Sequence, residues 1–206
     1  MFNVCPGCGE YDDAKDVLPG GIAKCTSCGH LHSFVKLPLF VVTGASGTGK
    51  TSALLRMNTR LPECVCLESD ILWRDEFNKD GNFLEYRNLW LRVAKNINQS
   101  YRPVVLFGST LPGQFEECNE SRYFSAIHYL AFVCAQDELV RRLTARPGWR
   151  KSGTDEVVER MISFNQWFLE NAGRSGMKIV DTTDLDIEGS AAATEDWVRS
   201  FLPIPA

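Results

Sequence analysis

The chain of 206 residues contains no apolar run that approaches the roughly 20 residues of a membrane-spanning helix. It has no strong excess of one charge, and its net charge of −4 gives no whole-chain preference for nucleic acid or for an anionic membrane. Residues 1–6 contain neither the charged region nor the apolar region of a secretory signal. We therefore expect a cytoplasmic protein with no membrane partner.

The composition, with 44% hydrophobic and 23% charged residues, is ordinary for a globular protein. The length is sufficient for one domain together with a small additional module. A segment rich in cysteine and glycine gives way to a strong apolar run near Lys36, Leu37 and Pro38. We predict a small module over residues 1–36 and a larger domain over residues 37–206.

A complete phosphate-binding loop, G-x-x-x-x-G-K-[ST], occupies residues 44–51. It follows the apolar run 39–42 and precedes the good helix formers 52–57, which is the strand–loop–helix context that the motif needs. Glycines let backbone N–H groups close around a phosphate, and a helix N-terminus adds the positive end of its dipole. We predict an ATP site formed by Gly44, Ser46, Gly47, Thr48, Gly49, Lys50 and Thr51, with Lys50 on the β/γ-phosphates and the Thr51 hydroxyl on Mg²⁺.

Apolar runs and helical segments alternate along the rest of the chain. Strands are expected at about 39–43, 64–68, 103–107, 127–134 and 177–181. Helices are expected at 50–59, about 82–100, 136–146, 154–171 and 190–201. Strands that alternate with helices of this length indicate an α/β fold, a parallel sheet covered on both faces, with the phosphate loop at its carboxyl edge.

Two acids follow the second predicted strand, at Glu68 and Asp70. An extended strand points residues two apart to one side, so one carboxylate can serve Mg²⁺ and the other can accept a proton from an attacking hydroxyl. Ser69 or Asp70 as the cap of a following helix is the alternative, and the two roles are compatible. The third strand runs into Gly108 without an acid, which makes Glu68 the expected metal-side carboxylate.

A run of five cations without an acid extends from Arg141 to Lys151 and includes Arg142, Arg146 and Arg150. It ends a predicted helix and enters a Pro-Gly break, as a closing lid would. Cations that converge on a transferring phosphoryl group are the expected electrostatic catalysts. A solvated helix end remains the alternative.

Four of the eight cysteines form two C-x-x-C-G knuckles, Cys5/Cys8 and Cys25/Cys28, separated by 16 residues. This spacing is typical of a zinc site, and four thiolates close a tetrahedral shell around a structural ion. A disulfide pair is disfavoured in a reducing compartment, and a redox C-x-x-C would occur once, near a βαβ unit. Iron is a minor alternative to zinc.

The cysteine module carries three lysines against four acids, and four thiolates on Zn²⁺ add negative charge. This balance disfavours binding to a phosphate backbone. We expect a folding role or a docking role toward a protein partner, with nucleic acid as the less favoured partner.

Residues 38–203 resemble the small P-loop kinases, which include shikimate, gluconate, chloramphenicol, adenylylsulfate and nucleoside-monophosphate kinases. Residues 44–51 match their Walker A loop, Glu68-Ser69-Asp70 resembles the D-x-D of the shikimate kinase branch with Glu for the first Asp, and residues 108–110 resemble its Gly-rich stretch. The resemblance implies a three-layer α/β/α fold with strand order 2-3-1-4-5, lid arginines at Arg142, Arg146 and Arg150, and an acceptor contact at Asp70. An N-terminal zinc ribbon is not a usual part of these kinases.

These observations predict an ATP-dependent phosphotransferase that acts on a nucleotide, a nucleoside or a small alcohol. An ATP-switched binding module with slow hydrolysis, whose ribbon docks a protein or RNA, is the alternative. A polynucleotide 5′-hydroxyl kinase is disfavoured by the weak basic character outside the lid.

Overall fold

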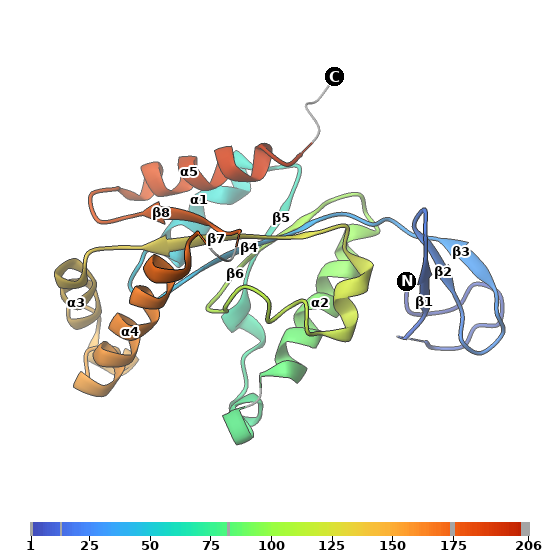
Figure 1. The fold of residues 1–206 in the computed structure, drawn as a ribbon, viewed down its shortest axis with the longest axis horizontal. Coiled ribbons are helices and arrows are strands. Elements are labelled where there is room, and N and C mark those ends of the chain that lie inside the picture. The colour runs from blue at the N-terminus through green and yellow to red at the C-terminus, as the bar shows by residue number, and fades with distance from the viewer. Residues whose placement is uncertain (1, 13, 82, 174–175, 203–206) are drawn as a thin grey trace. The chain divides into compact units, whose positions relative to one another are not determined.

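The computed structural model describes residues 2–12, 14–81, 83–173 and 176–202 of the chain (Figure 1). These form two compact units that interleave along the sequence. The first unit consists of Met1–Leu39, Leu72–Val104 and Gly113–Ile127, and the second of Phe40–Ile71, Val105–Pro112 and His128–Ala206. The predicted domains over residues 1–36 and 37–206 stay a prediction, because the units group segments by contact and not by chain order.

The second unit is built on a five-stranded parallel sheet in the order β5-β6-β4-β7-β8. Its strands are β4 (Leu39–Gly44), β5 (Val65–Glu68), β6 (Val104–Phe107), β7 (Ile127–Val133) and β8 (Lys178–Asp181). Counted along the chain, this order is 2-3-1-4-5. The predicted fold class is therefore confirmed.

The central strands are apolar along their whole length because both faces of the sheet are covered. Every residue of β4 and of β6 is buried, which is the pattern of a parallel sheet with a helix layer on each side. At the edge, β8 pairs in parallel with β7, with Leu130 opposite Lys178 and Val133 opposite Asp181.

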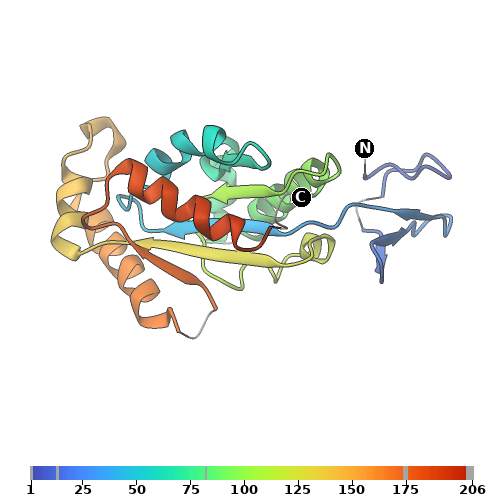
Figure 2. The ribbon, with the colours of Figure 1, turned by 90° about the horizontal axis from the view of Figure 1, so that it is seen from above.

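Four helices belong to this unit, namely α1 (Lys50–Arg60), α3 (Gln136–Thr144), α4 (Asp155–Asn171) and α5 (Ile187–Arg199). Figure 1 shows α1 and α5 together on one face of the sheet and α4 on the other, and Figure 2 shows α5 lying over the strands. The main core joins α1 and α5 to the sheet through residues such as Phe40, Met57, Phe107, Phe132 and Trp197.

The first unit contains the cysteine module, α2 (Leu84–Asn98) and three short 3-10 segments or parts of them: η1 (Ser69–Leu72), which ends in it, η2 (Asp75–Gly81) and η3 (Asn119–Tyr123). The module holds a three-stranded antiparallel sheet of β1 (Asp16–Leu18), β2 (Ile22–Lys24) and β3 (Leu31–Ser33). Residue 82, where the predicted second helix starts, lies outside the described residues. In the part of the chain that the structure covers, no helix is long and apolar enough to cross a membrane.

Candidate active site

The phosphate loop turns sharply out of the sheet at Gly44, the last residue of β4. The φ of Gly44 is 134°, and a Cβ added there would lie 2.2 Å from the Phe132 carbonyl oxygen of the neighbouring strand. Only glycine fits both the backbone conformation and the close approach. The loop then ends at Gly49, the N-cap of α1, so the helix N-terminus faces the site of the predicted phosphates.

Lys50 opens α1 and folds its side chain back over the loop. Its ammonium donates to the carbonyl oxygens of Gly44 at 2.6 Å and Ala45 at 2.9 Å. Burial lowers the pKa of Lys50 to about 8, an effect that the Asp70 carboxylate opposes and the Arg146 guanidinium reinforces. A partly buried cation that is hydrogen-bonded to carbonyl oxygens is stabilised when an anion arrives beside it.

Thr51 and Glu68, the two predicted magnesium-side residues, are in direct contact. The Thr51 hydroxyl donates to Glu68 Oε1 at 2.6 Å, which links the first turn of α1 to the last residue of β5. Hydroxyl and carboxylate oxygens are the ligand type that Mg²⁺ prefers. The donor set therefore fits the predicted ion.

Asp70 stands exposed on η1, one residue beyond a buried neighbour. Ser69 is 7% exposed and packs so close to Gly108 that a Cβ on that glycine would lie 2.4 Å from the Ser69 hydroxyl oxygen. The Ser69 hydroxyl donates to Asp70 Oδ1 at 3.4 Å. The close contact with β6 holds the turn that presents Asp70.

Arg146 and Arg150 both lie in the segment between α3 and α4, where η4 (Gly148–Arg150) forms a short turn that ends at Arg150. Burial and then the nearby positive charge of Arg150 lower the pKa of Arg146. The two guanidinium groups therefore repel each other and a polyanion between them would relieve the repulsion.

One cavity of about 690 Å³ brings most of the predicted site together. Its walls include the loop and both acids, the two arginines, and further cations that sequence reasoning did not assign to the site, Lys151 and Arg160. The predicted residues that line it are Ser46, Gly47, Gly49, Lys50, Thr51, Glu68, Asp70, Arg146 and Arg150. The size suits a drug-sized or nucleotide-sized ligand.

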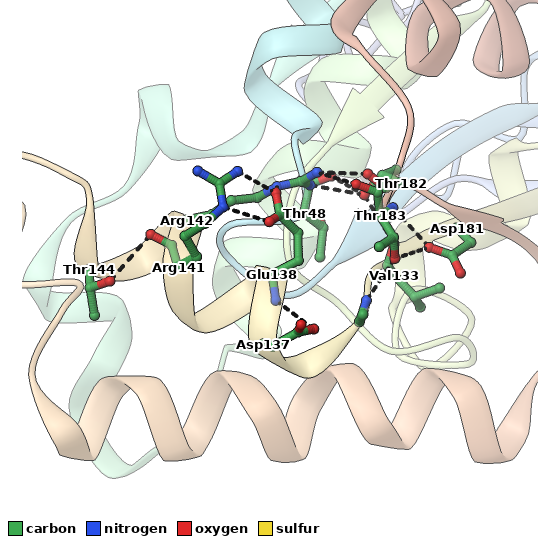
Figure 3. Close-up of polar contacts among 11 residues, drawn as sticks. Thr48, Val133, Asp137, Glu138, Arg141, Arg142, Thr144, Asp181, Thr182 and Thr183 are labelled. Atoms are coloured by element: carbon green, nitrogen blue, oxygen red, sulfur yellow. Dashed lines mark hydrogen bonds and ion pairs between the residues drawn. The ribbon is translucent and has the colours of Figure 1, made fainter.

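Arg142 does not line this cavity. Figure 3 shows its guanidinium between Glu138 and the segment after β8, where it donates to the Thr182 carbonyl at 2.7 Å and the Thr183 carbonyl at 3.2 Å. The Glu138 carboxylate accepts from Arg142 and from Arg141, and these bonds hold the pKa of Glu138 down at about 2. Arg142 thus ties α3 to the loop that leaves β8.

A second hollow of about 410 Å³ lies beside this tie and is lined by Thr48, Arg142 and Asp186 among others. Thr48 is buried, and its carbonyl accepts from the Thr182 hydroxyl at 3.0 Å. Gly47 and Gly49 line both hollows. The two spaces therefore meet at the phosphate loop.

Two other lining residues carry no motif that could have identified them. The Ser46 N–H donates to the sulfur of Met161 on α4 at 3.3 Å, although the two residues are 115 positions apart. Trp149 is 77% exposed, and the Arg150 guanidinium lies 5.1 Å from its ring centre. Both depend on how α4 and η4 pack against the loop.

The four knuckle cysteines are gathered at one point, as predicted. Their sulfur atoms all lie within 4.8 Å of one another, with Cys5 and Cys28 at 3.7 Å and Cys8 and Cys25 at 3.9 Å. A disulfide would bring a pair to about 2.05 Å, whereas a tetrahedral ion with Zn–S bonds of about 2.3 Å separates its ligands by about 3.8 Å. The cluster has the spacing of a metal shell.

No protein-family model matches the chain, and no curated protein matches its sequence. Solved kinase structures have the same fold. A sugar kinase from Janibacter sp. HTCC2649 gives a TM-score of 0.61 at 12% identity over 80% of this chain and 95% of that one. Shikimate kinase from Acinetobacter baumannii, solved with shikimate, gives 0.52 at 15% identity over 81% and 96%. The chain therefore has the P-loop kinase fold.

Proposed function

We propose that the protein is an ATP-dependent phosphotransferase that moves the γ-phosphoryl group of Mg-ATP to a small-molecule acceptor: a nucleotide, a nucleoside or a small alcohol. One observation carries the proposal. The phosphate loop, the Thr51–Glu68 pair, the exposed Asp70 carboxylate and two lid-side arginines all line one cavity. A nucleotide switch needs the loop and the metal ligands, but it has no use for an exposed carboxylate beside several cations.

In the proposed reaction an acceptor oxygen attacks the γ-phosphorus, and the bond to the bridging oxygen breaks so that ADP leaves. Lys50, Arg146 and Arg150 neutralise the charge on the phosphoryl oxygens. Asp70 orients the acceptor hydroxyl and takes its proton when the acceptor is an alcohol. An acceptor phosphate is already anionic and needs only to be positioned.

The cofactors in this proposal are ATP, Mg²⁺ and a structural Zn²⁺. Thr51 and Glu68 would hold the magnesium ion, which would offset the negative charge of the phosphate groups. Cys5, Cys8, Cys25 and Cys28 hold the zinc ion, as the spacing of their sulfur atoms supports.

The test is ADP formation by the purified protein across a panel of nucleotides, nucleosides and small alcohols, with Lys50→Met as the matched control. Stimulation by one acceptor, absent in the control, supports the kinase. Stimulation only by RNA or a protein would overturn it in favour of an ATP-switched binding module.

A further inference from the structure

The cysteine module does not form a compact unit of its own. It shares one with α2 and η3, segments that follow it by dozens of residues and that flank β6 in the sequence. A module of this size cannot bury enough apolar surface to be stable alone. The contacts within the unit show what each part supplies to the other.

Side-chain amides on α2 bind the backbone of the module at two places. Asn96 accepts from the Phe2 N–H at 3.3 Å and donates to Asn3 Oδ1 at 3.1 Å. One turn further on, Gln99 accepts from the Val35 N–H at 3.0 Å and donates to the Val35 carbonyl at 3.1 Å. Both ends of the module are therefore hydrogen-bonded to the C-terminal end of α2, through Asn96 and the C-cap residue Gln99.

The apolar core of the unit is also shared. Phe2 packs with its ring centre 5.2 Å from that of Phe34 and 5.1 Å from that of Tyr123, the last residue of η3. Tyr123 is 1% exposed, and its hydroxyl donates to the Lys15 carbonyl at 3.1 Å. Removing the module would expose Tyr123, and removing η3 would open the module's core.

A buried ion pair lies directly under this core. Lys95 of α2 and Glu120 of η3 are 2.5 Å apart, with side chains 1% and 4% exposed. The Lys95 ammonium lies 4.3 Å from the centre of the Tyr123 ring and 5.3 Å from that of Phe2. A buried pair is stable only while its surroundings keep their geometry, so the contact between α2 and η3 depends on the position of Phe2.

The position of Phe2 depends in turn on the cysteine cluster. The two knuckles have the same backbone bonds, in which the N–H of Cys5 donates to Glu10 and that of Cys25 donates to His30. Within the module, Asp12 also accepts from the N–H and the hydroxyl of Thr26, both at 2.9 Å, and Phe2 packs on Phe34, but the three strands have only three residues each. A metal ion held by the thiolates of residues 5, 8, 25 and 28 would join the two knuckles directly and reinforce these contacts.

We propose that the metal bound by Cys5, Cys8, Cys25 and Cys28 braces α2 and η3, so that its occupancy controls the order of the chain segments that enter and leave the candidate active site. The chain passes into this unit at Leu72, two residues after Asp70, and again at Gly113, after the cavity-lining Gly108 and Ser109. The phosphate loop, the lid-side cations and Asp70 itself belong to the other unit. Asp70 lies two residues from the point where the chain enters the braced unit, whereas the phosphate loop is held between β4 and α1, so metal loss is expected to disturb Asp70 more than nucleotide binding.

Hydrogen exchange of the full-length protein tests the brace directly. We expect about one zinc ion per chain in the purified protein. Removal of the ion with a strong chelator should speed exchange in Leu84–Asn98 roughly tenfold or more and leave Asp155–Asn171 and Ile187–Arg199 within about twofold. Re-addition of zinc should restore protection. The proposal would be overturned if the protein neither contained nor bound zinc. It would also be overturned if hydrogen exchange in α2 were the same with and without the metal, or if α2, α4 and α5 lost protection equally.

Three variants separate the brace from a general need for the metal. Cys28→Ser removes one exposed ligand, and Cys66→Ala is its control, since Cys66 lies outside the cluster. Asn96→Ala keeps all four ligands but removes one fastening. This variant should retain zinc while hydrogen exchange in α2 becomes faster. Chelation of zinc from the variant should then increase α2 exchange by less than it does in the wild-type protein. Unchanged exchange in Asn96→Ala with zinc bound would contradict the brace.

The consequence for phosphoryl transfer rests on the proposed function. In the chelated protein the KM for the acceptor should rise and kcat should fall, while the Kd for ATP changes less than about twofold. Hydrogen exchange and zinc content can both be measured without knowing the phosphoryl acceptor. They can therefore support the brace even if the protein proves not to be a kinase, and they can overturn it even if the protein is one.

Discussion

The Thr51 hydroxyl donates to the Glu68 carboxylate over 2.6 Å, joining the start of α1 to the end of β5. The adjoining strand β6 ends at Phe107 and is followed by Gly108 and Ser109, so it brings no acid to this edge of the sheet. Within the cavity Glu68 and Asp70 are the carboxylates, and Glu68 is the one bound to the phosphate-loop threonine. In the proposed function this pair forms the magnesium side of the site.

Glu68→Gln should therefore raise the Mg²⁺ concentration for half-maximal turnover by about 10–100-fold, because the amide keeps the shape and loses the charge. The measurement is a magnesium titration at saturating ATP. Glu63→Gln, which changes an exposed acid paired with Arg199 at 3.2 Å, serves as the control. An unchanged magnesium requirement in Glu68→Gln would remove this residue from the metal site.

Nucleotide binding should weaken as the pH rises through the Lys50 pKa of about 8. This value is below the ordinary 10.5, so in the free protein the ammonium loses its proton between pH 7 and pH 9. Phosphate oxygens bind the charged form, and the Kd for ATP should therefore increase by up to about tenfold over that interval. Calorimetry at pH 8 in buffers of different ionisation enthalpy should record proton uptake on binding.

Lys50→Met supplies the control for this prediction. It should bind ATP weakly at every pH in the interval and take up no proton at that site. Wild-type affinity that stays constant from pH 7 to pH 9 would show that the ammonium is not what the phosphates bind.

Asp70→Asn distinguishes an alcohol acceptor from a phosphate acceptor. If Asp70 takes a proton from a hydroxyl, kcat should fall by about 10²–10⁴-fold while the Kd for ATP stays unchanged. If the acceptor is a phosphate, the change should act mainly on the acceptor KM. Asp196→Asn, an exposed acid on α5, is the matched control. Full activity with wild-type KM in Asp70→Asn would exclude both roles.

Two of the predicted lid arginines, Arg142 and Arg146, should differ in their effects. Arg142 is bonded to Glu138 and to the Thr182 and Thr183 carbonyls, so Arg142→Ala should cost about 1–3 kcal/mol in the free energy of unfolding. Arg146→Ala should leave that stability within about 0.5 kcal/mol and reduce kcat by about 10²–10³-fold. Urea denaturation and steady-state kinetics on both variants test this. If Arg142→Ala were as stable as the wild-type protein but inactive, Arg142 would have a catalytic role and not a structural one.

The Arg142 contacts also show why sequence alone could not sort these arginines. All three lie in one cationic run, but Arg142 is on α3, Arg150 is on η4 and Arg146 lies between them, so the direction of each side chain depends on a different piece of backbone. Glu138 lies four residues before Arg142, and that spacing on a helix is a recognised ion-pair signal. It could have indicated that Arg142 already has a partner.

The phosphate loop and the alternation of strands with helices were predictable because both follow from local pattern, whereas the strand order was implied by the resemblance to the small P-loop kinases. A buried apolar run, a glycine-rich turn and a helix former in succession leave the chain few alternatives. The partnership of the cysteine module with α2 and η3 was not predictable. Its contacts join residues such as Phe2 and Asn96, 94 positions apart, and neither residue belongs to a motif.

The fate of the γ-phosphoryl group tests the central claim most directly. The protein is incubated with ATP labelled at the γ-phosphorus and with the acceptor panel, and the label is followed into products. We predict that the label enters the phosphorylated form of one acceptor, an ester for a hydroxyl acceptor or an anhydride for a phosphate acceptor, only when that acceptor is present, and not with Lys50→Met. Recovery of the label as inorganic phosphate, at the same rate with and without every acceptor, would contradict it.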